Sequence, residues 1–512
     1  MEIIIKSLLA REINMDKNTQ VAVQTYWDYI IIGTGMGGSV LGLSLAKAGK
    51  KVLFCEKGLS FEKLKATSNF PEMSKDKITL DNLKKSGRRF APIFDLSFNK
   101  SHEFVPFLGE GAGGSSLLYG MAMERGRPED FNSWPVSYDE MKLFYDEAEI
   151  LFGVAPSKVL HPQNKVVQEF LMAKGLHPYK LPLASQQNPE CPGCQGHLCN
   201  HNSKNHAGNR ALAEALKYPG VMLLDECNAQ SLTIETNKVS EVIIKRNLQS
   251  FSLKSERIVL AAGALETPRI LFRSQSPLCP SGAANSSDQV GKNLMRHLID
   301  LYVVDAKSLE TNGATKQIAF NDFYHLQEGK GGTVQSFGKM PPIKMILQDI
   351  FRDISFHSKI ASSIAQLFAP FLGYFLKNIF SQSIVLASIV EDSPCESNRV
   401  LNTTDQTSFI YKVQNADKNR LDGMRRKMHE ALKEKLKMKI YGGEKNTLLG
   451  HACGTCRMGL DPKNSVVNKE GRTHDLENLY IVDSSVFPTS LGVNPSLTIV
   501  ANALRIAKGL VS

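Results

Sequence analysis

A chain of 512 residues is longer than one hydrophobic core usually supports, so we expect two or three domains, or one large domain with an insertion. Its apolar content of 42% and charged content of 22% exclude a disordered, fibrous or wholly membrane-embedded protein. The net charge of +10 comes from scattered lysines and arginines without a nucleic-acid motif, so we expect a solvated basic surface and no nucleic-acid partner.

The cysteine content and the most apolar stretches of the sequence indicate in which cellular compartment the protein is expected. The nine cysteines are an odd set without the density of a small disulfide-linked protein, which favours a reducing compartment. The N-terminal stretch MEIIIKSLLAREINMDKNTQ lacks a small-residue cleavage site, so no signal peptide is predicted. The most apolar stretch, 360–380, is interrupted by Gln366, Pro370 and Lys377 and falls short of a spanning helix. We expect a cytoplasmic protein and leave a peripheral membrane contact open.

The first strong pattern is a strand, a glycine turn, a helix and a second strand. The run YWDYIIIG is followed by GTGMGG, an apolar helix to residue 50 and the strand KVLFCEKG. Gly33, Gly35 and Gly38 give the spacing that lets a helix N-terminus approach a pyrophosphate, and Glu56 can accept from a ribose. This pattern predicts dinucleotide binding. Met36 and Gly37, which lie in the same turn, would also contact the dinucleotide. A merely close-packed turn is the alternative.

Further elements follow in chain order. The stretch FLGEGAGGSSLLYG holds a second glycine turn at Gly113 and Gly114, followed by Ser115. A surface helix is predicted over 137–153, a cysteine-rich loop over 189–209, and a helix and strands from 211 to 263. Residues 300–395 are the least regular region and are interpreted as a substrate cap. The C-terminal part of the chain returns to strand and helix, with Asp483 near a strand end.

At this point the sequence resembles the glucose-methanol-choline (GMC) family of flavin oxidoreductases, from Trp27 to Ala507. The matching segments are the first glycine motif, GGSS with RGRPEDF, LAAGALETPRIL, VGKNLMRH, HACGTCRMG and NLYIVDSSVFPTSLGVNPSLTIVANALRIA. The resemblance implies FAD rather than NAD, and a mixed α/β fold. A Rossmann-like FAD domain would comprise 26–136, 206–299 and 446–512, and a cap domain with an antiparallel sheet would comprise 137–205 and 300–445.

The resemblance also implies how FAD is held. Tyr119 stands where many members carry Asn, and no His in this turn is available for the covalent flavin bond of some relatives, so noncovalent FAD is implied. The resemblance therefore does not specify which atoms around Tyr119 contact the flavin. The predicted cofactor-binding residues are Gly33, Gly35, Met36, Gly37, Gly38, Glu56, Gly113, Gly114, Ser115, Tyr119, Gly120, Ala229, Asp483, Asn494, Pro495 and Ser496.

Two polar residues near the C-terminus are the predicted reacting groups. Removing a hydroxyl proton while a hydride leaves carbon needs a base, and neutral histidine suits this near pH 7. A single histidine is more often structural, but the family match makes His451 the expected base. The family carries His or Asn at the position of Asn494. With Asn here, the chain resembles the His/Asn branch of the family, which includes cholesterol oxidases and FAD-dependent sugar and alcohol dehydrogenases. It could equally cap a helix, with Pro495 at the first helical position.

Two cysteine-containing segments raise the question of a metal. His451, Cys453 and Cys456 lack a full ligand set, and the family match explains them without metal. Cys191, Cys194 and Cys199 could ligate zinc or an iron–sulfur cluster, although their spacing fits no standard motif. We predict no metal, and leave the cluster open as an alternative.

The predicted function is hydride removal from the CH–OH group of a small-molecule alcohol. Aromatic residues of the cap favour a lipophilic or sterol-like substrate reached from a membrane surface, although they could equally form the core of the cap. The electron acceptor is oxygen or a quinone. A fatty-acid photodecarboxylase-like lyase and a dehydrogenase with an additional iron–sulfur cluster are the alternatives.

Overall fold

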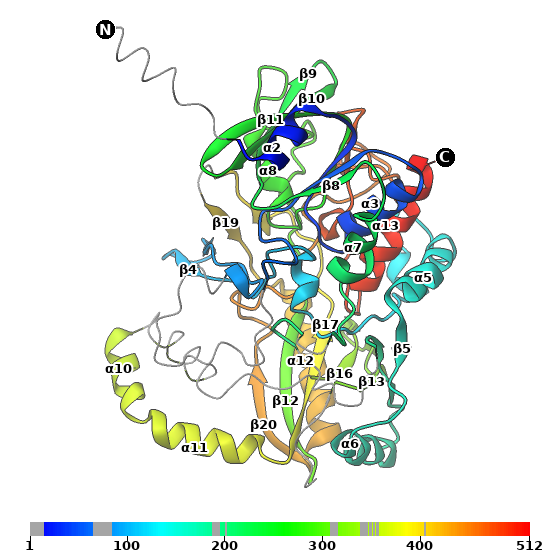
Figure 1. Ribbon diagram of the computed structural model, residues 1–512. Coiled ribbons are helices and arrows are strands. Elements are labelled where there is room, and N and C mark those ends of the chain that lie inside the picture. Colours follow the sequence, from blue (N-terminus) through cyan, green and yellow to red (C-terminus); the bar gives the residue numbers. More distant parts are fainter. Residues whose placement is uncertain are drawn as a thin grey trace.

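A computed structural model describes residues 15–64, 84–186, 195–199, 202–307, 316–337, 347, 351, 354, 358–403 and 406–511. Figure 1 shows two main bodies of structure, one around a mixed sheet near both ends of the chain and one around long antiparallel strands below it. This confirms the mixed α/β fold class predicted from the sequence.

The first sheet is a parallel α/β layer extended by a hairpin. Its strands are ordered β8-β2-β1-β11-β10-β9, with β21 paired to the other edge of β11. Strands β8, β2, β1, β11 and β21 run parallel, whereas β9 and β10 are antiparallel. The bounds are β1 Tyr26–Ile32, β2 Val52–Cys55, β8 Val221–Leu224, β9 Asn228–Glu235, β10 Lys238–Arg246, β11 Gln249–Leu260 and β21 Leu479–Ile481.

Helices cover the parallel part of this sheet because its strands are apolar on both faces. Helix α3 is buried along nearly its whole length and packs against α13 (Figure 1). The bounds of the helices around this body are α2 Lys17–Gln24, α3 Met36–Lys47, η1 Gly114–Leu117, η2 Pro128–Phe131, α5 Tyr138–Phe152, η3 Gly208–Leu212, α7 Ala213–Ala215, α8 Thr267–Arg273, η4 Ser484–Val486 and α13 Ser496–Val511.

The second sheet is antiparallel throughout, in the order β20-β12-β17-β16-β13-β6. Its long strands β12 and β17 lie in the region that the sequence presented as least regular. Helices α6 and α12 pack against it. The bounds are β6 Tyr179–Lys180, β12 Leu298–Asp305, β13 Ile318–Phe320, β16 Val334–Ser336, β17 Ser383–Val390, β20 Leu436–Tyr441, α6 Pro162–Ala173 and α12 Asn415–Leu432.

Smaller sheets connect the two bodies. Strand β19 pairs with β3 in parallel, which joins two segments that are far apart in the sequence. The bounds are β3 Ile93–Asp95, β4 His102–Phe104, β18 Arg399–Val400 and β19 Thr407–Ile410 in one sheet, β5 Val154–Pro156 and β7 Pro182–Ala184 in a second, and β14 His325–Leu326 and β15 Gly329–Lys330 in a third.

Two short helices, α10 (Lys359–Leu367) and α11 (Ala369–Phe380), form an arm along the lower edge of the molecule (Figure 1). They meet at an angle of 67°, and together they have the length and apolar composition of a bent membrane segment. In the described part of the chain, no single helix is long and apolar enough to cross a bilayer.

Candidate active site

The first glycine turn ends β1 and opens α3. Gly33 has φ +100°, a left-handed conformation that favours glycine. A Cβ atom on Gly33, Gly37 or Gly38 would lie 2.4, 2.0 or 2.2 Å from a backbone carbonyl oxygen, so these three positions pack backbone on backbone. Gly35, the N-cap of α3, is different: a Cβ there would meet nothing within 4 Å, and no side chain caps the helix. The helix N-terminus therefore faces open space.

The second glycine turn lies directly against the first. The Gly113 amide donates to Thr34 Oγ1 at 3.2 Å, and a Cβ on Gly114 would be 2.9 Å from the Cα of Gly35. Ser115 Oγ accepts a hydrogen bond from the Gly109 amide at 3.3 Å, which joins the two ends of the loop 109–115. The structure therefore brings together two glycine turns that are well separated in the sequence.

Glu56, predicted to bind a ribose, is buried at the carboxyl end of β2. Its Oε2 accepts from the Thr34 amide at 3.1 Å and from Thr34 Oγ1 at 2.5 Å, and its Oε1 accepts from the Gly58 amide at 2.9 Å. Burial raises the pKa of the carboxyl, and these hydrogen bonds oppose that rise. Glu56 thus fixes the first glycine turn, and its ribose role stays a prediction.

Asp483 ties the carboxyl end of β21 to the neighbouring turn. Its Oδ2 accepts from the Gly263 amide at 2.8 Å and from Thr267 Oγ1 at 2.6 Å, while Oδ1 accepts from the Ser485 amide at 2.8 Å. A Cβ on Gly37 would lie 3.5 Å from the Cα of Asp483, so this residue adjoins the first glycine turn.

The remaining predicted cofactor residues are more dispersed. Met36 is the buried first residue of α3, and Ala229 lies within β9, where its carbonyl accepts from Arg273. The Tyr119 hydroxyl donates to the Asn205 carbonyl, and Gly120 packs against the side chain of Lys316. Pro495 and Ser496 lie at the start of α13.

At the reacting end, His451 and Asn494 meet. His451 has φ +65° in the loop before Cys453, and its Nε2 lies 3.5 Å from Asn494 Nδ2. The sequence allowed Asn494 to be the helix cap with Pro495 inside the helix, and the structure corrects this alternative. Helix α13 starts at Ser496, the Pro495 carbonyl accepts the first helical hydrogen bond, and Asn494 Oδ1 instead accepts from Gln335 Nε2 at 2.6 Å.

A second histidine fixes the tautomer of His451. His297 is fully buried, and its Nε2 lies 2.8 Å from the Leu491 carbonyl, so this nitrogen must carry the proton. Nδ1 of neutral His297 is then an acceptor, and it lies 2.8 Å from Nδ1 of His451. His451 must therefore carry its proton on Nδ1, which leaves a lone pair on Nε2 beside Asn494.

Burial keeps both imidazoles neutral. It lowers the pKa of His297 to about 4, against the opposing effect of the backbone carbonyls. The pKa of His451 is lowered well below its usual value, first by burial and then by electrostatic interaction with His297 and with Lys316. A neutral His451 with a free Nε2 can accept a proton near pH 7.

Gln335 orients Asn494 from the second sheet. It lies on β16 and donates through Nε2 both to Asn494 Oδ1 and to the buried carboxyl group of Glu124. Tyr179 also donates to Glu124, whose pKa burial raises. Because Asn494 Oδ1 is occupied, its Nδ2 hydrogens are directed toward His451 Nε2.

The sequence reasoning missed His297, Gln335, Glu124 and Lys316. His297 and Glu124 lie in segments that matched the family, VGKNLMRH and GMAMERGRPEDF, and a histidine or carboxylate there was a usable signal. Gln335 and Lys316 lie in the irregular cap region without a motif, so only their three-dimensional position identifies them.

No metal site emerges from the described residues, where no group of three histidine, cysteine or carboxylate side chains is placed to hold an ion. Cys453 and Cys456 are buried, and burial raises the pKa of both thiols well above the usual value. Cys191 and Cys194 lie outside the described residues, so the cluster alternative stays a prediction.

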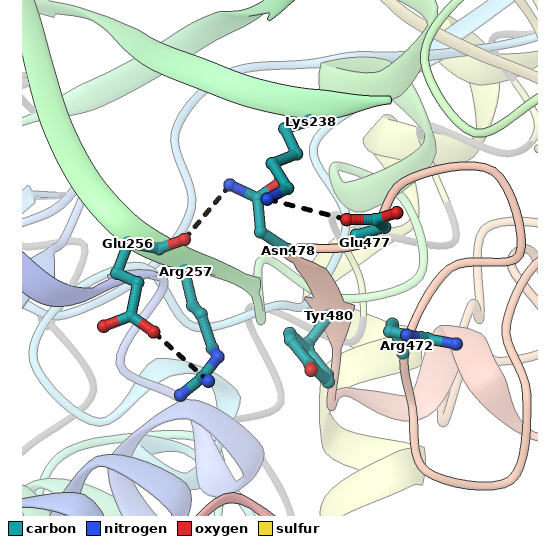
Figure 2. Close-up of a pocket in the computed structure, with 7 residues that line it drawn as sticks. All are labelled: Lys238, Glu256, Arg257, Arg472, Glu477, Asn478 and Tyr480. Carbon is teal, nitrogen blue, oxygen red and sulfur yellow. Dashed lines mark hydrogen bonds and ion pairs between the residues drawn. The ribbon is translucent and has the colours of Figure 1, made fainter. Parts of the chain in front are cut away.

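A surface pocket of about 320 Å³ lies elsewhere, at the amino end of β21 (Figure 2). Its charged groups pair with one another, Lys238 with Glu477 at 3.6 Å and Arg257 with Glu256 at 3.2 Å. Ligands of parallel α/β sheets bind at the carboxyl ends of the strands, where Asp483 and the glycine turns lie. This pocket includes none of the predicted site residues.

Comparison with known protein families shows to which family the chain belongs. Two models described as GMC oxidoreductase match residues 27–299 and 398–503, which together make up well over half of the chain. The chain belongs to the GMC oxidoreductase family. The family resemblance predicted from sequence is thereby confirmed, as is the prediction of a flavin oxidoreductase.

Relatives within the GMC family differ in their named substrates. The chain is 28% identical to paromamine 6'-oxidase of Streptomyces fradiae, over 94% of this chain and 91% of that protein. It is 23% identical to cholesterol oxidase of Acinetobacter baumannii, over 94% and 93%. Among solved structures, pyridoxine 4-oxidase from Mesorbium loti has a TM-score of 0.64 at 18% identity, covering 94% and 99%, and Aspergillus oryzae formate oxidase, whose FAD is modified, has 0.66 at 14%, covering 95% and 98%.

The residues present fit the FAD that the GMC family implies. The uncapped N-terminus of α3 and the vacant space over Gly35 would accommodate a diphosphate, with its charge favoured by the helix dipole. The orphaned buried Oε1 atoms of Glu110 and Gln335 lie near the first glycine turn and beside Asn494, respectively. Both ends of the site thus keep polar groups without a partner in the described part of the chain.

Proposed function

We propose that this protein is an FAD-dependent oxidoreductase that removes a hydride from the CH–OH group of a small-molecule alcohol, with His451 as the base. The observation that carries the proposal is the convergence of an unprotonated imidazole nitrogen and an amide N–H donor 3.5 Å apart. One hydroxyl oxygen can donate its proton to His451 Nε2 and accept a hydrogen bond from Asn494 Nδ2.

Each residue has a defined task in this reaction. His451 Nε2 takes the hydroxyl proton, and His297 Nδ1 accepts from the opposite edge of the ring, which keeps Nε2 free. The Asn494 amide donates to the oxygen as its negative charge grows, and Gln335 holds that amide in place. FAD, when bound, supplies the hydride acceptor. The alcohol thus loses a proton to His451 and a hydride to the cofactor, and leaves as a carbonyl compound.

The decisive experiment is anaerobic flavin bleaching with sugars, choline, fatty alcohols and sterols in the dark. Replacing His451→Ala should slow bleaching by about 10²–10⁴-fold with FAD retained, because general-base catalysis contributes about that much. His429→Ala, which removes an exposed histidine of α12, is the matched control and should bleach like the wild type. Bleaching at the wild-type rate in His451→Ala would overturn the base assignment.

The same experiment separates the lyase alternative. A photodecarboxylase-like enzyme would release carbon dioxide from a fatty acid only under light, and would not bleach with alcohols in the dark. The convergent base and amide support alcohol oxidation instead. Whether oxygen or a quinone accepts the electrons is decided by reoxidising the bleached enzyme with each acceptor in turn.

We also propose that FAD is held without a covalent bond. The segment GGSSLLYG supplies no histidine to attach the flavin, and the open space at Gly35 would leave room for a noncovalently bound diphosphate. Acid precipitation should therefore release all of the yellow colour into the supernatant. A protein pellet that stays yellow would contradict this proposal.

We further propose a lipophilic substrate, taken from a membrane surface on which a cytoplasmic enzyme docks peripherally. The arm of α10 and α11 supports this, because seven of its large apolar side chains are more than half exposed: Ile360, Ile364, Leu367, Phe368, Phe371, Tyr374 and Phe375. No acidic residue occurs between Ile354 and Val390, while Lys359 and Lys377 flank the apolar stretch. An apolar face with basic flanks is the composition that binds an anionic bilayer.

A further inference from the structure

Lys316 is a buried cation that the proposed proton transfer does not use. It lies two residues before β13, and only 7% of its surface is exposed. Strand β13 is the neighbour of β16 in the second sheet, and β16 carries Gln335 to the Asn494 amide. The lysine therefore lies on the segment that leads into the strand next to β16.

The side chains of Gln195 and Lys316 together fill the space that glycine leaves at position 120. A Cβ on Gly120 would lie 3.0 Å from Lys316 Cδ. The ammonium also lies 5.6 Å from the centroid of the Phe337 ring. Gly120 belongs to the turn that the family resemblance assigns to flavin contact, so Lys316 adjoins that turn, and it also acts electrostatically on His451.

The ammonium has no hydrogen-bond acceptor in the part of the chain that the structure describes. Glu124 is the carboxylate that acts on it electrostatically, but no ion pair joins them, and Glu124 accepts instead from Tyr179 and Gln335. Burial lowers the pKa of Lys316 to about 8, so it is still mainly charged at pH 7. Its charge also reaches His451, whose pKa it lowers.

A buried, charged group without a partner is one of the costliest features of a protein interior. Such groups occur where a ligand completes the pair. Three N–H donors and a positive charge match a carboxylate or a similar oxyanion better than a neutral group.

We propose that Lys316 binds an oxyanion of the substrate, so that the enzyme oxidises an alcohol that also carries a carboxylate-class group. This inference rests on the proposed function, because it assumes that the substrate occupies the space beside His451. Together with the apolar arm, it points to an anionic amphiphile rather than a sterol or a simple sugar.

The titratable groups that interact electrostatically with the ammonium are Glu124 and His451. His451 is neutral near pH 7, and the carboxyl of Glu124 is saturated by its own donors, so the state of Lys316 decides oxyanion binding. Binding should hold at neutral pH and weaken as the pH rises past about 8, where the ammonium loses its proton.

The test uses FAD-loaded protein and two ligands of equal length, sodium decanoate and decanamide, which carry no hydroxyl group and cannot be oxidised as alcohols. Binding is measured by calorimetry and by the change in flavin absorption. Decanoate should bind the wild type, and Lys316→Met should raise its dissociation constant at least about tenfold, as expected for a desolvated charge pair. Lys316→Arg should retain most of the binding. Lys254→Met, a surface control, and all decanamide titrations should show no change.

Three results would overturn the proposal: decanoate and decanamide binding equally to the wild type, decanoate binding unaltered by Lys316→Met, and no weakening of decanoate binding above about pH 8. The last measurement uses only the wild type, so it stands if Lys316→Met fails to fold. Failure of the proposed function is distinguishable, because it would appear as alcohol bleaching in His451→Ala, whereas these titrations need no turnover.

Discussion

Two buried side chains, His297 and Gln335, decide which atoms of His451 and Asn494 face the reacting centre. The hydrogen bond to His297 keeps the proton of His451 on Nδ1, so this nitrogen cannot act as the base. Gln335 donates to Asn494 Oδ1, which leaves the Nδ2 group of Asn494 as the available donor. Each acts through one hydrogen bond from an element distant in sequence. Both are assigned a role through His451 and Asn494, so both are positioning residues.

Replacing His297→Leu should lower kcat/KM for the alcohol by about 10–100-fold, because His451 can then place its proton on Nε2. The acid limb of the pH profile should move to higher pH, because His297 helps to keep the pKa of His451 low. His297→Gln keeps an acceptor and a donor and should restore most of the rate. An unchanged pH profile in His297→Leu with full FAD content would contradict the assignment.

The sequence singled out the two proposed reacting residues but not the side chains that position them. His451 and Asn494 occur in segments similar to known GMC proteins, so a local pattern was enough. Gln335 and Lys316 act from the cap, where short strands carry no periodicity and where a single glutamine or lysine has no distinguishing neighbour. Such residues can be recognised only when the second sheet brings them to the site.

At the scale of elements, the segment β1–α3–β2 was predicted closely because its pattern is local. Its glycines and apolar strands have to be close together in sequence for the turn to form. The regularity of 300–395 was underestimated, since it includes the eight-residue strands β12 and β17. These two strands pair with each other although a long segment of chain separates them, and sequence periodicity does not report such distant partners.

The glycine turn gives a prediction at this scale. Gly35→Ala should weaken FAD binding at least about tenfold without lowering the Tm of the cofactor-free protein, because a Cβ there meets no protein atom but enters the space over the helix N-terminus. Titration of FAD into the apoprotein, followed by fluorescence quenching, measures this. The control is Gly509→Ala, in open space near the end of α13, which should bind FAD normally. Equal FAD affinities for the two variants would refute the role of Gly35.

At the scale of the whole molecule, the arm of α10 and α11 distinguishes one side of the protein (Figure 1). Its exposed aromatic side chains lie on the same body as the second sheet, which supplies Gln335 and Lys316 to the reacting end. The apolar content of 360–380 was visible in the sequence. The sequence could not show whether these residues form the core of the cap or an exposed surface, because burial depends on what packs against them.

The wild-type protein should cosediment with vesicles of phosphatidylcholine and phosphatidylserine at low salt. Each buried aromatic or aliphatic side chain contributes roughly 1.5–3 kcal/mol, so the double variant Ile364→Asp, Phe371→Asp should lose binding by about two orders of magnitude. Phe98→Asp, which changes an equally exposed aromatic residue elsewhere, should bind as the wild type does. A wild-type protein that stays in the supernatant at low salt would rule out the membrane proposal.

The position of β21 has a consequence for biosynthesis. The first turn of α3 packs so tightly on the Val482 carbonyl that Gly37 has no room for a methyl group, and α13 then lies along α3. A nascent chain therefore contains its glycine loop long before Val482, against which that loop packs, has been synthesised. We expect FAD to load only after β21 and α13 have been synthesised, and a nonsense mutation that removes these two elements should leave a colourless protein.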